Sequence, residues 1–142
     1  MKVKLFFPLI FLSSSSFCFA ESFNFPIEYK TYYLNDKPIR FIKNKSKIIT
    51  ISINCGEDYS KEFKGKCLAI AALYKVNNKD IKITDLKGGK NPGSVLCKKS
   101  VHGRVVFLKD PYRNTSTFCQ FQDGSYLSND TLSSYGYRNA KK

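Results

Sequence analysis

Four of the five cysteines of this 142-residue chain lie beyond residue 50, and their spacing constrains the fold more than any other feature. An even number of cysteines in a small domain is typical of a disulfide framework formed in an oxidising compartment. Four cysteines allow three pairings, and we favour Cys55–Cys67 and Cys97–Cys119, because each pair joins neighbouring predicted elements. A metal site is the weaker alternative, because the chain has one histidine and no Cys-x-x-Cys spacing. We therefore expect neither a metal nor another cofactor.

The N-terminus predicts export, which is the condition for such disulfides. Two lysines precede an apolar run from Leu5 to Leu12, and a serine stretch then leads to Ala20, which is the order of regions in a signal peptide. The apolar run is well short of the ~20 residues that a membrane-spanning helix needs. Cys18 leaves a lipid-anchored N-terminus open, but no leucine lies three positions before it. We favour cleavage after Ala20.

Residues 21–142 are then a single secreted domain with no transmembrane segment, located in the periplasm or outside the cell. The full chain has 24 lysine and arginine residues against 11 acidic residues, a formal net charge of +13, and removal of Lys2 and Lys4 with the leader leaves 22 against 11, a charge of +11. Such an excess of positive charge attracts polyanions and acidic surfaces. The sequence contains no signal for the oligomeric state.

The first part of the domain, residues 21–86, predicts a sheet covered by a helix. β-prone runs from Ile27 to Tyr33 and from Ile39 to Ile42 flank a turn at Asn35–Pro38, and a third strand is expected from Lys47 to Asn54. Apolar residues at helical spacing predict a helix from about Ser60 to Val76. A short strand, Ile81–Ile83, and a linker, Leu86–Lys90, follow.

The second part, residues 91–128, predicts a short helix and a hairpin. Asn91 is suited to cap a helix that has Pro92 at its first position. Strands are expected from Arg104 to Leu108 and from Thr117 to Phe121, followed by an Asp-Gly turn, a short strand at Tyr126–Leu127 and one helical turn in the tail, capped by Asn129 or Thr131. We therefore expect an α+β fold: an antiparallel sheet with one main helix, plus a disulfide-tied short helix and hairpin.

Two segments of this second part carry a resemblance. Asn91-Pro92-Gly93-Ser94-Val95-Leu96-Cys97 and Phe118-Cys119-Gln120-Phe121-Gln122-Asp123-Gly124-Ser125 resemble a small domain of bacterial exported proteins and lipoproteins that is often labelled haemolysin. The motif residues are Asn91, Pro92, Ser94, Asp123, Gly124 and Ser125. The resemblance covers the C-terminal third only, and it implies a bacterial cell-envelope location and a bridge between Cys97 and Cys119.

The sequence departs from that family at several positions. Gly93 stands where the family usually has alanine, and Gln122 stands where it has proline. Leu127 or Ser128 replaces a third cysteine, and the chain has no tryptophan. The family label is a name more than an activity, so the resemblance implies no mechanism.

The chemistry-bearing residues argue against an enzyme. His102 is the only histidine, and it lies beside a predicted turn, where a surface histidine is the simpler interpretation. Most acidic residues fall at turns or helix caps, where a carboxylate serves local backbone donors. No acid–base pair is indicated.

Basic residues interleaved with aromatic residues are the feature with most functional content. If alternate positions of the first hairpin point one way, Arg40 and the lysines around it form a basic face that suits phosphate or carboxylate groups. The alternative to an anion-binding surface is an ordinary solvated polar face without a binding role. The candidate anion-binding residues are Arg40, Lys43, Lys45, Lys47, Arg104 and Arg113.

The function we favour is a non-catalytic exported binding protein that contacts an anionic envelope component or an envelope protein. The alternative is a secreted inhibitor or effector acting on another protein.

Overall fold

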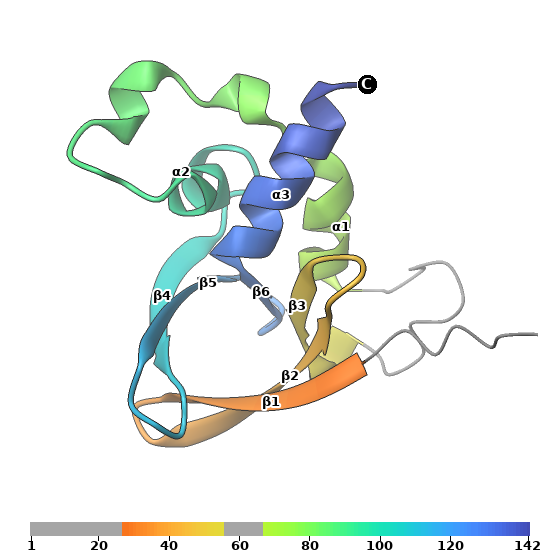
Figure 1. Ribbon diagram of the computed structural model, residues 1–142, viewed down its shortest axis with the longest axis vertical. Coiled ribbons are helices and arrows are strands. Elements are labelled where there is room, and N and C mark those ends of the chain that lie inside the picture. Colours follow the sequence, from red (N-terminus) through yellow and green to blue (C-terminus); the bar gives the residue numbers. More distant parts are fainter. Residues whose placement is uncertain (1–26, 56–66) are drawn as a thin grey trace, which may run out of the picture.

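In the part of the chain that the structure describes, six strands form one closed antiparallel barrel in the order β1-β2-β3-β6-β5-β4 (Figure 1). The computed structural model describes residues 27–55 and 67–142. The strands are β1 Ile27–Leu34, β2 Lys37–Asn44, β3 Ile49–Ser52, β4 Arg104–Lys109, β5 Thr115–Gln120 and β6 Tyr126–Ser128. The predicted leader, residues 1–20, lies outside the described residues.

The first hairpin follows from its turn. Asn35 and Asp36 both have positive φ, 49° and 61°, as a two-residue type I′ turn requires, and such a turn matches the twist of the strands that it joins. Pro38, predicted in the turn, belongs to β2 and lies opposite Tyr33. The predicted third strand is shorter than expected, because β3 ends at Ser52 and a 3-10 helix, Ile53–Cys55, follows it.

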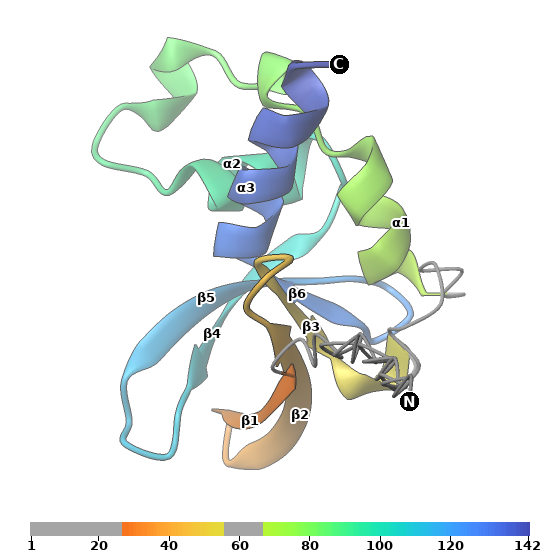
Figure 2. The same cartoon turned by 45° about the vertical axis from the view of Figure 1, so that its right-hand side comes forward.

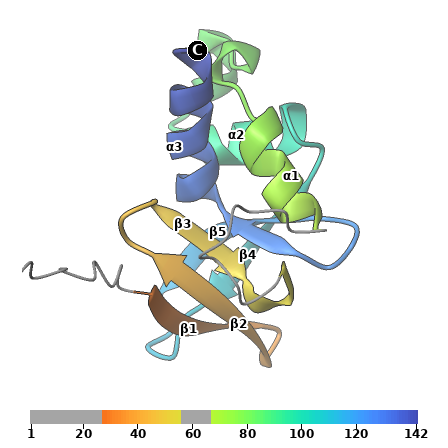
Figure 3. The same cartoon turned by 90° about the vertical axis from the view of Figure 1, so that its right-hand side faces the viewer.

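The three α-helices of the described residues lie on one side of the barrel (Figures 1 and 2), and in Figure 3 the first hairpin lies on the side away from them. They are α1 Leu68–Lys75, α2 Pro92–Lys99 and α3 Asn129–Ala140. The 3-10 helices η2, Asn78–Asp80, and η3, Ile83–Leu86, connect α1 to α2. No helix in the two described ranges has the length and apolar character that crossing a bilayer requires.

Alternation along the strands gives the fold two apolar clusters. One cluster fills the barrel, where the rings of Phe41 and Phe118 have centroids 4.7 Å apart and Val106, Leu108 and Tyr126 surround them. The larger cluster lies between the barrel and the helices and includes Ile51, Leu73, Leu96 and Leu132. The strands therefore bury one face inside the barrel and part of the other beneath the helices.

The two predicted disulfide pairs are confirmed. Cys55 is joined to Cys67, just before α1, and Cys97 of α2 is joined to Cys119 of β5. Cys97 and Cys119 are both fully buried. The second bridge therefore ties α2 directly to the barrel.

The predicted fold class is wrong, because the two parts of the domain do not form a sheet and a separate hairpin unit. Ile51 of β3 pairs with Leu127 of β6, and Tyr33 of β1 pairs with Lys109 of β4. These pairs close all six strands into one barrel. Pairing between residues so far apart in sequence leaves no local signal, so only the packed structure shows it.

Three smaller predictions are corrected as well. Ile81–Ile83 is not a strand; Ile81 ends η2 and η3 begins at Ile83. The tail forms the 12-residue helix α3 rather than one turn, and Ser128 caps it by accepting a hydrogen bond from the Thr131 N–H. Of the long helix predicted from Ser60, residues 60–66 lie outside the described residues, and α1 begins at Leu68.

Candidate functional site

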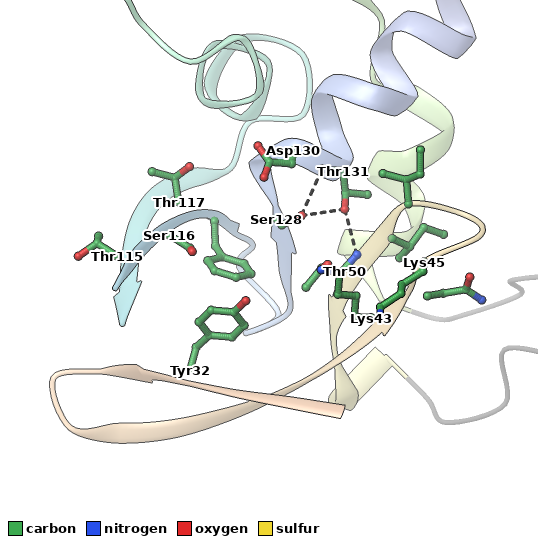
Figure 4. A pocket seen from close by; sticks show the side chains of 14 residues that line it. Tyr32, Lys43, Lys45, Thr50, Thr115, Ser116, Thr117, Ser128, Asp130 and Thr131 are labelled. Atoms are coloured by element: carbon green, nitrogen blue, oxygen red, sulfur yellow. Dashed lines mark hydrogen bonds between the residues drawn. The ribbon is translucent and has the colours of Figure 1, made fainter. Parts of the chain in front are cut away.

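A pocket opens at the end of the barrel where β6 is too short to reach. β5 pairs with β6 through three residue pairs, from Phe118–Ser128 to Gln120–Tyr126, and β3 pairs with β6 through Ile51 alone. Thr115, Ser116 and Thr117 of β5 therefore extend beyond the last residue of β6. The chain turns into α3 at this point, which leaves an opening between β5 and β3 (Figure 4).

This barrel-mouth pocket has a volume of about 580 Å³, and seven of its fourteen lining residues carry a hydroxyl. Its lining side chains come from the first hairpin, the β2–β3 turn, β3, β5, the end of β6 and the first turn of α3. The polar lining residues are Tyr32, Lys43, Asn44, Lys45, Thr50, Thr115, Ser116, Thr117, Ser128, Asp130 and Thr131.

Two of the lining hydroxyls hold the pocket together. The buried Thr131 Oγ accepts a hydrogen bond from the Thr50 N–H at 3.0 Å and lies 2.8 Å from the Ser128 Oγ. These bonds fix the first turn of α3 against β3. One wall of the pocket is thus built from groups that already have partners.

The opposite wall of the pocket carries hydroxyls that are available to a ligand. Within the described chain, the side chains of Thr115, Ser116 and Thr117 make no hydrogen bond. Figure 4 shows Tyr32 rising from the first hairpin into the opening. Burial raises the pKa of the Tyr32 phenol, so its hydroxyl is protonated at neutral pH and able to donate.

The charge in the pocket comes from two lysines and one aspartate. Lys43 is on the same face of β2 as Phe41, which fills the barrel, so its chain starts from the inner side of the mouth. It makes no ion pair within the described residues, whereas the exposed Lys45 lies 3.8 Å from Glu28. Asp130 in the first turn of α3 is the only carboxylate in the lining.

The structure brings two of the six predicted anion-binding residues together, Lys43 and Lys45. Arg40 lies three residues before Lys43 and so on the opposite face of β2, while Lys47 lies in the β2–β3 turn. Arg104 is at the other end of β4, opposite Gln120, and Arg113 is in the β4–β5 turn with a φ of 66°. The predicted basic face is therefore divided among different surfaces.

Sequence reasoning missed the hydroxyls of the pocket. Thr115-Ser116-Thr117 is a run of three hydroxyl residues at the start of a strand, and this run was the available signal. Nothing in the sequence shows that the run stands beside Lys43, because that neighbourhood depends on closure of the barrel. Tyr32 belongs to the run of aromatic residues in the first predicted strand, and the sequence does not show that its side chain enters a pocket.

The first half of the sequence motif serves to assemble the helices. The Asn91 side chain accepts from the Ser94 N–H at 3.2 Å and so caps α2, with Pro92 as the first helical residue. The Ser94 hydroxyl accepts from the Asn129 side-chain amide at 2.7 Å, which links α2 to α3.

The second half of the motif caps α1. The Asp123 carboxylate accepts from the Leu68 N–H at 2.7 Å, and the Ser125 hydroxyl accepts from the Ala69 N–H at 3.1 Å. Gly124 allows the turn between them through a φ of 77°. The motif residues therefore have structural roles, although Asn91 and Ser94 also line a second groove.

That second groove, the helix–strand groove, lies between η3, α2 and β4. Its volume is about 630 Å³. Its floor is apolar, with Val95, Val105 and the exposed Phe107, and its rim is basic, with Lys90, Lys98 and Lys99. Thr117 lines both the groove and the barrel-mouth pocket.

Among the described residues, no carboxylate lines the surface depression that contains His102. His102 is exposed and has a φ of 54°, and the depression has a volume of about 220 Å³. Ser100 in the same depression donates its hydroxyl hydrogen to Asp80 at 2.5 Å. The depression therefore offers no serine–histidine–acid arrangement.

The carboxylates are mostly engaged in local structure. The Lys99 ammonium bound to Asp85, and the Asn114 amide bound to Asp110, hold the pKa of each carboxyl below its usual range. Burial of Asp123 raises its pKa, but hydrogen bonds from Ser125 and Leu68 outweigh that effect and lower it. Within residues 27–55 and 67–142, no three His, Cys, Asp or Glu side chains gather as a metal site.

Neither protein-family models, nor curated proteins, nor solved structures include a match to this chain. The resemblance of the C-terminal third to haemolysin-type exported domains therefore stays a prediction from the sequence.

Proposed function

We propose that this chain is a non-catalytic exported binding protein, and that its barrel-mouth pocket holds an anionic group of a cell-envelope component. The observation that carries the proposal is the set of groups around one opening. Lys43, which makes no ion pair within the described residues, faces the same cavity as the uncommitted hydroxyls of Thr115, Ser116 and Thr117.

These groups suit a ligand that bears both negative charge and hydroxyls. A lysine ammonium binds phosphate or carboxylate as a point charge, and serine, threonine and tyrosine hydroxyls both donate to and accept from sugar hydroxyls. Acidic glycans of the envelope combine the two kinds of group. The formal net charge of the full chain is +13, and the +11 that remains without Lys2 and Lys4 of the leader adds long-range attraction toward such a ligand.

The location is part of the same proposal. Two disulfide bonds support folding in an oxidising compartment, and the leader-like N-terminus supports export to the periplasm or beyond. The resemblance to haemolysin-type exported domains supports a bacterial envelope. Identification of a mature N-terminus at Glu21, by intact mass of protein from the native envelope, tests this part directly.

Calorimetric titration with an oligogalacturonate, an acidic sugar chain, tests the binding site. Replacing Lys43 and Lys45 together by glutamine is expected to weaken binding roughly tenfold, because it removes the charged contacts of the pocket. A matched pair, Lys79→Gln with Lys87→Gln, removes the same charge from exposed positions outside the pocket and is expected to retain most of the affinity. Equal weakening by both pairs would show general charge attraction and contradict the pocket.

A further inference from the structure

The helix–strand groove carries an inference that is independent of the barrel-mouth pocket. Its central feature is Phe107, which is 64% exposed although it lies in the middle of β4. Neighbouring Val106 and Leu108 point into the barrel, so Phe107 and Val105 point to the outside. Val95 of α2 completes the apolar floor. An apolar surface of this kind with a polar rim is typical of an interaction site.

The rim of the groove is positively charged. Lys90 precedes α2, and Lys98 and Lys99 occupy its last turn. The one carboxylate in the lining, Asp85, is already engaged, because it accepts from the Lys99 ammonium at 2.5 Å and from the Lys82 N–H at 2.8 Å. The groove therefore presents Lys90 and Lys98 to a partner with little opposing charge.

The backbone beside the groove has an open edge. β4 pairs with β5 along its whole length, but on its other side it pairs with β1 only at Lys109. Figure 1 shows β4 diverging from β1 beyond that point. Within the described chain, the edge from Arg104 to Leu108 thus has no strand partner, and an open edge of this kind accepts an added strand.

We infer that the helix–strand groove and the adjoining edge of β4 bind an extended acidic segment of a partner protein that carries an apolar side chain. Pairing with β4 supplies backbone hydrogen bonds, and alternate side chains of the added strand lie on the same face as Phe107. Its apolar side chain covers Phe107, and its carboxylates meet Lys90 and Lys98. The charge of the rim and the apolar floor together select this chemistry.

Fluorescence anisotropy with the full secreted chain, both disulfides intact, tests the inference. The probe is a short fluorescein-labelled peptide that is rich in glutamate and has one central leucine. Phe107→Thr, which keeps a β-prone residue, is expected to weaken binding roughly tenfold, and Lys90→Gln with Lys98→Gln to a similar degree. Tyr112→Thr is the matched control, because Tyr112 is 85% exposed in the adjoining β4–β5 turn but does not line the groove.

Changes in the probe test each element of the inference. Asparagine in place of the leucine, or prolines on both sides of it, is expected to weaken binding, because the first removes the apolar contact and the second removes backbone donors. Lys43→Gln with Lys45→Gln is expected to leave peptide binding unchanged, so the result is separate from that of the proposed function.

Three results would overturn the inference. One is the lack of saturable binding to the acidic probe. Another is equal weakening by Phe107→Thr and Tyr112→Thr, which would assign the effect to general surface apolarity. The third is undiminished binding of the leucine-free peptide together with competition by a sulfated polysaccharide, which would show a polyanion surface instead of a peptide groove. Circular dichroism and the lysine variants separate loss of binding from loss of the fold.

Discussion

At the scale of single residues, Asp123 connects the C-terminal hairpin to the start of α1. α1 has no side-chain cap from its own N-cap residue, Cys67. Asp123 and Ser125 accept from its first two N–H groups instead, and these groups have no partners within the helix. The sequence predicted a tight turn at Asp123-Gly124, but it did not predict that the turn caps a distant helix.

Replacing Asp123 by alanine is expected to cost about 1 kcal/mol of unfolding free energy at neutral pH, which is the usual loss for a helix cap. Burial acts to raise the folded pKa of Asp123, but hydrogen bonds from Ser125 and Leu68 hold it below the ordinary value of an aspartate. Its ionic stabilisation is therefore present above that value and is lost as the pH falls through the folded pKa. Urea unfolding of both proteins at neutral and acidic pH measures the difference.

Asp123→Asn is the control, because its amide oxygen still accepts from the Leu68 N–H but carries no charge. Asp123→Asn is expected to lose less unfolding free energy than the alanine variant at neutral pH, and its unfolding free energy is expected to depend less on pH than that of wild type. The difference in unfolding free energy between wild type and Asp123→Ala should shrink in acid. If that difference stays constant down to strongly acidic pH, the ionised carboxylate is not what stabilises α1.

At the scale of elements, the contact between α2 and α3 depends on a missing side chain. A β-carbon on Gly93 would lie 1.9 Å from the backbone oxygen of Asn129, the first residue of α3. Asn129 is fully buried and donates to the Ser94 hydroxyl in the next position of α2. Even the single methyl group of an alanine side chain would therefore not fit this packing.

Gly93→Ala is therefore expected to destabilise the protein, by roughly 1–3 kcal/mol, as overpacking of a close contact usually does. The effect opposes helix propensity, since alanine is the better helix former. Lys98→Ala on the exposed side of the same helix serves as the control and is expected to change stability by less than about 0.5 kcal/mol. Urea titration of the three proteins checks the prediction, and a Gly93→Ala variant as stable as wild type would contradict the close approach of α2 and α3.

The length of α3 was underestimated because its stability also depends on contacts with the other helices. Its sequence contains serine, asparagine and glycine, which are weak helix formers. Tertiary packing supplies what propensity lacks, because Leu132 and Gly136 are buried against the other helices. The Asn139 amide also donates to the Leu73 and Val76 carbonyls at the end of α1, at 2.9 and 2.8 Å.

At the scale of the whole molecule, the two disulfides are expected to contribute unequally. Sequence separations of 12 and 22 residues give similar loop-closure terms, roughly 3 kcal/mol each. Cys97 and Cys119 are also fully buried in the larger cluster, so replacing both by alanine removes core packing as well. Cys97→Ala with Cys119→Ala is therefore expected to lower stability more than Cys55→Ala with Cys67→Ala.

Urea unfolding without reductant measures both double variants. The expected gap between them is about 1–2 kcal/mol, which is the packing term alone. Wild type treated with reductant provides the control for loss of both bridges. Equal losses, or a larger loss for the Cys55–Cys67 pair, would show that the bridge between α2 and β5 is not the main covalent support of the fold.

Part of the candidate site could be predicted from the sequence. Lys43 and Lys45 were predicted as anion-binding residues, and the structure places both at the barrel mouth. Arg40 was grouped with Lys43 because the predicted strand ended at Ile42, whereas β2 continues to Asn44 and alternation along it puts the two side chains on opposite faces. Thr115–Thr117 joins the pocket because β6 ends early, and the length of a paired strand depends on its neighbours.

The sequence by itself determined the features that depend on local interactions. They are the Asn35-Asp36 turn, the Asn91-Pro92 start of α2, the strands around the Asp123-Gly124 turn and the sequential disulfides. Each rests on residues that interact within a few positions, or on cysteines whose neighbouring elements were predicted. Barrel closure through Ile51–Leu127 and Tyr33–Lys109 was decided only by the tertiary structure. Such pairs form because buried faces of distant strands must share one interior, and that requirement acts on the folded chain as a whole.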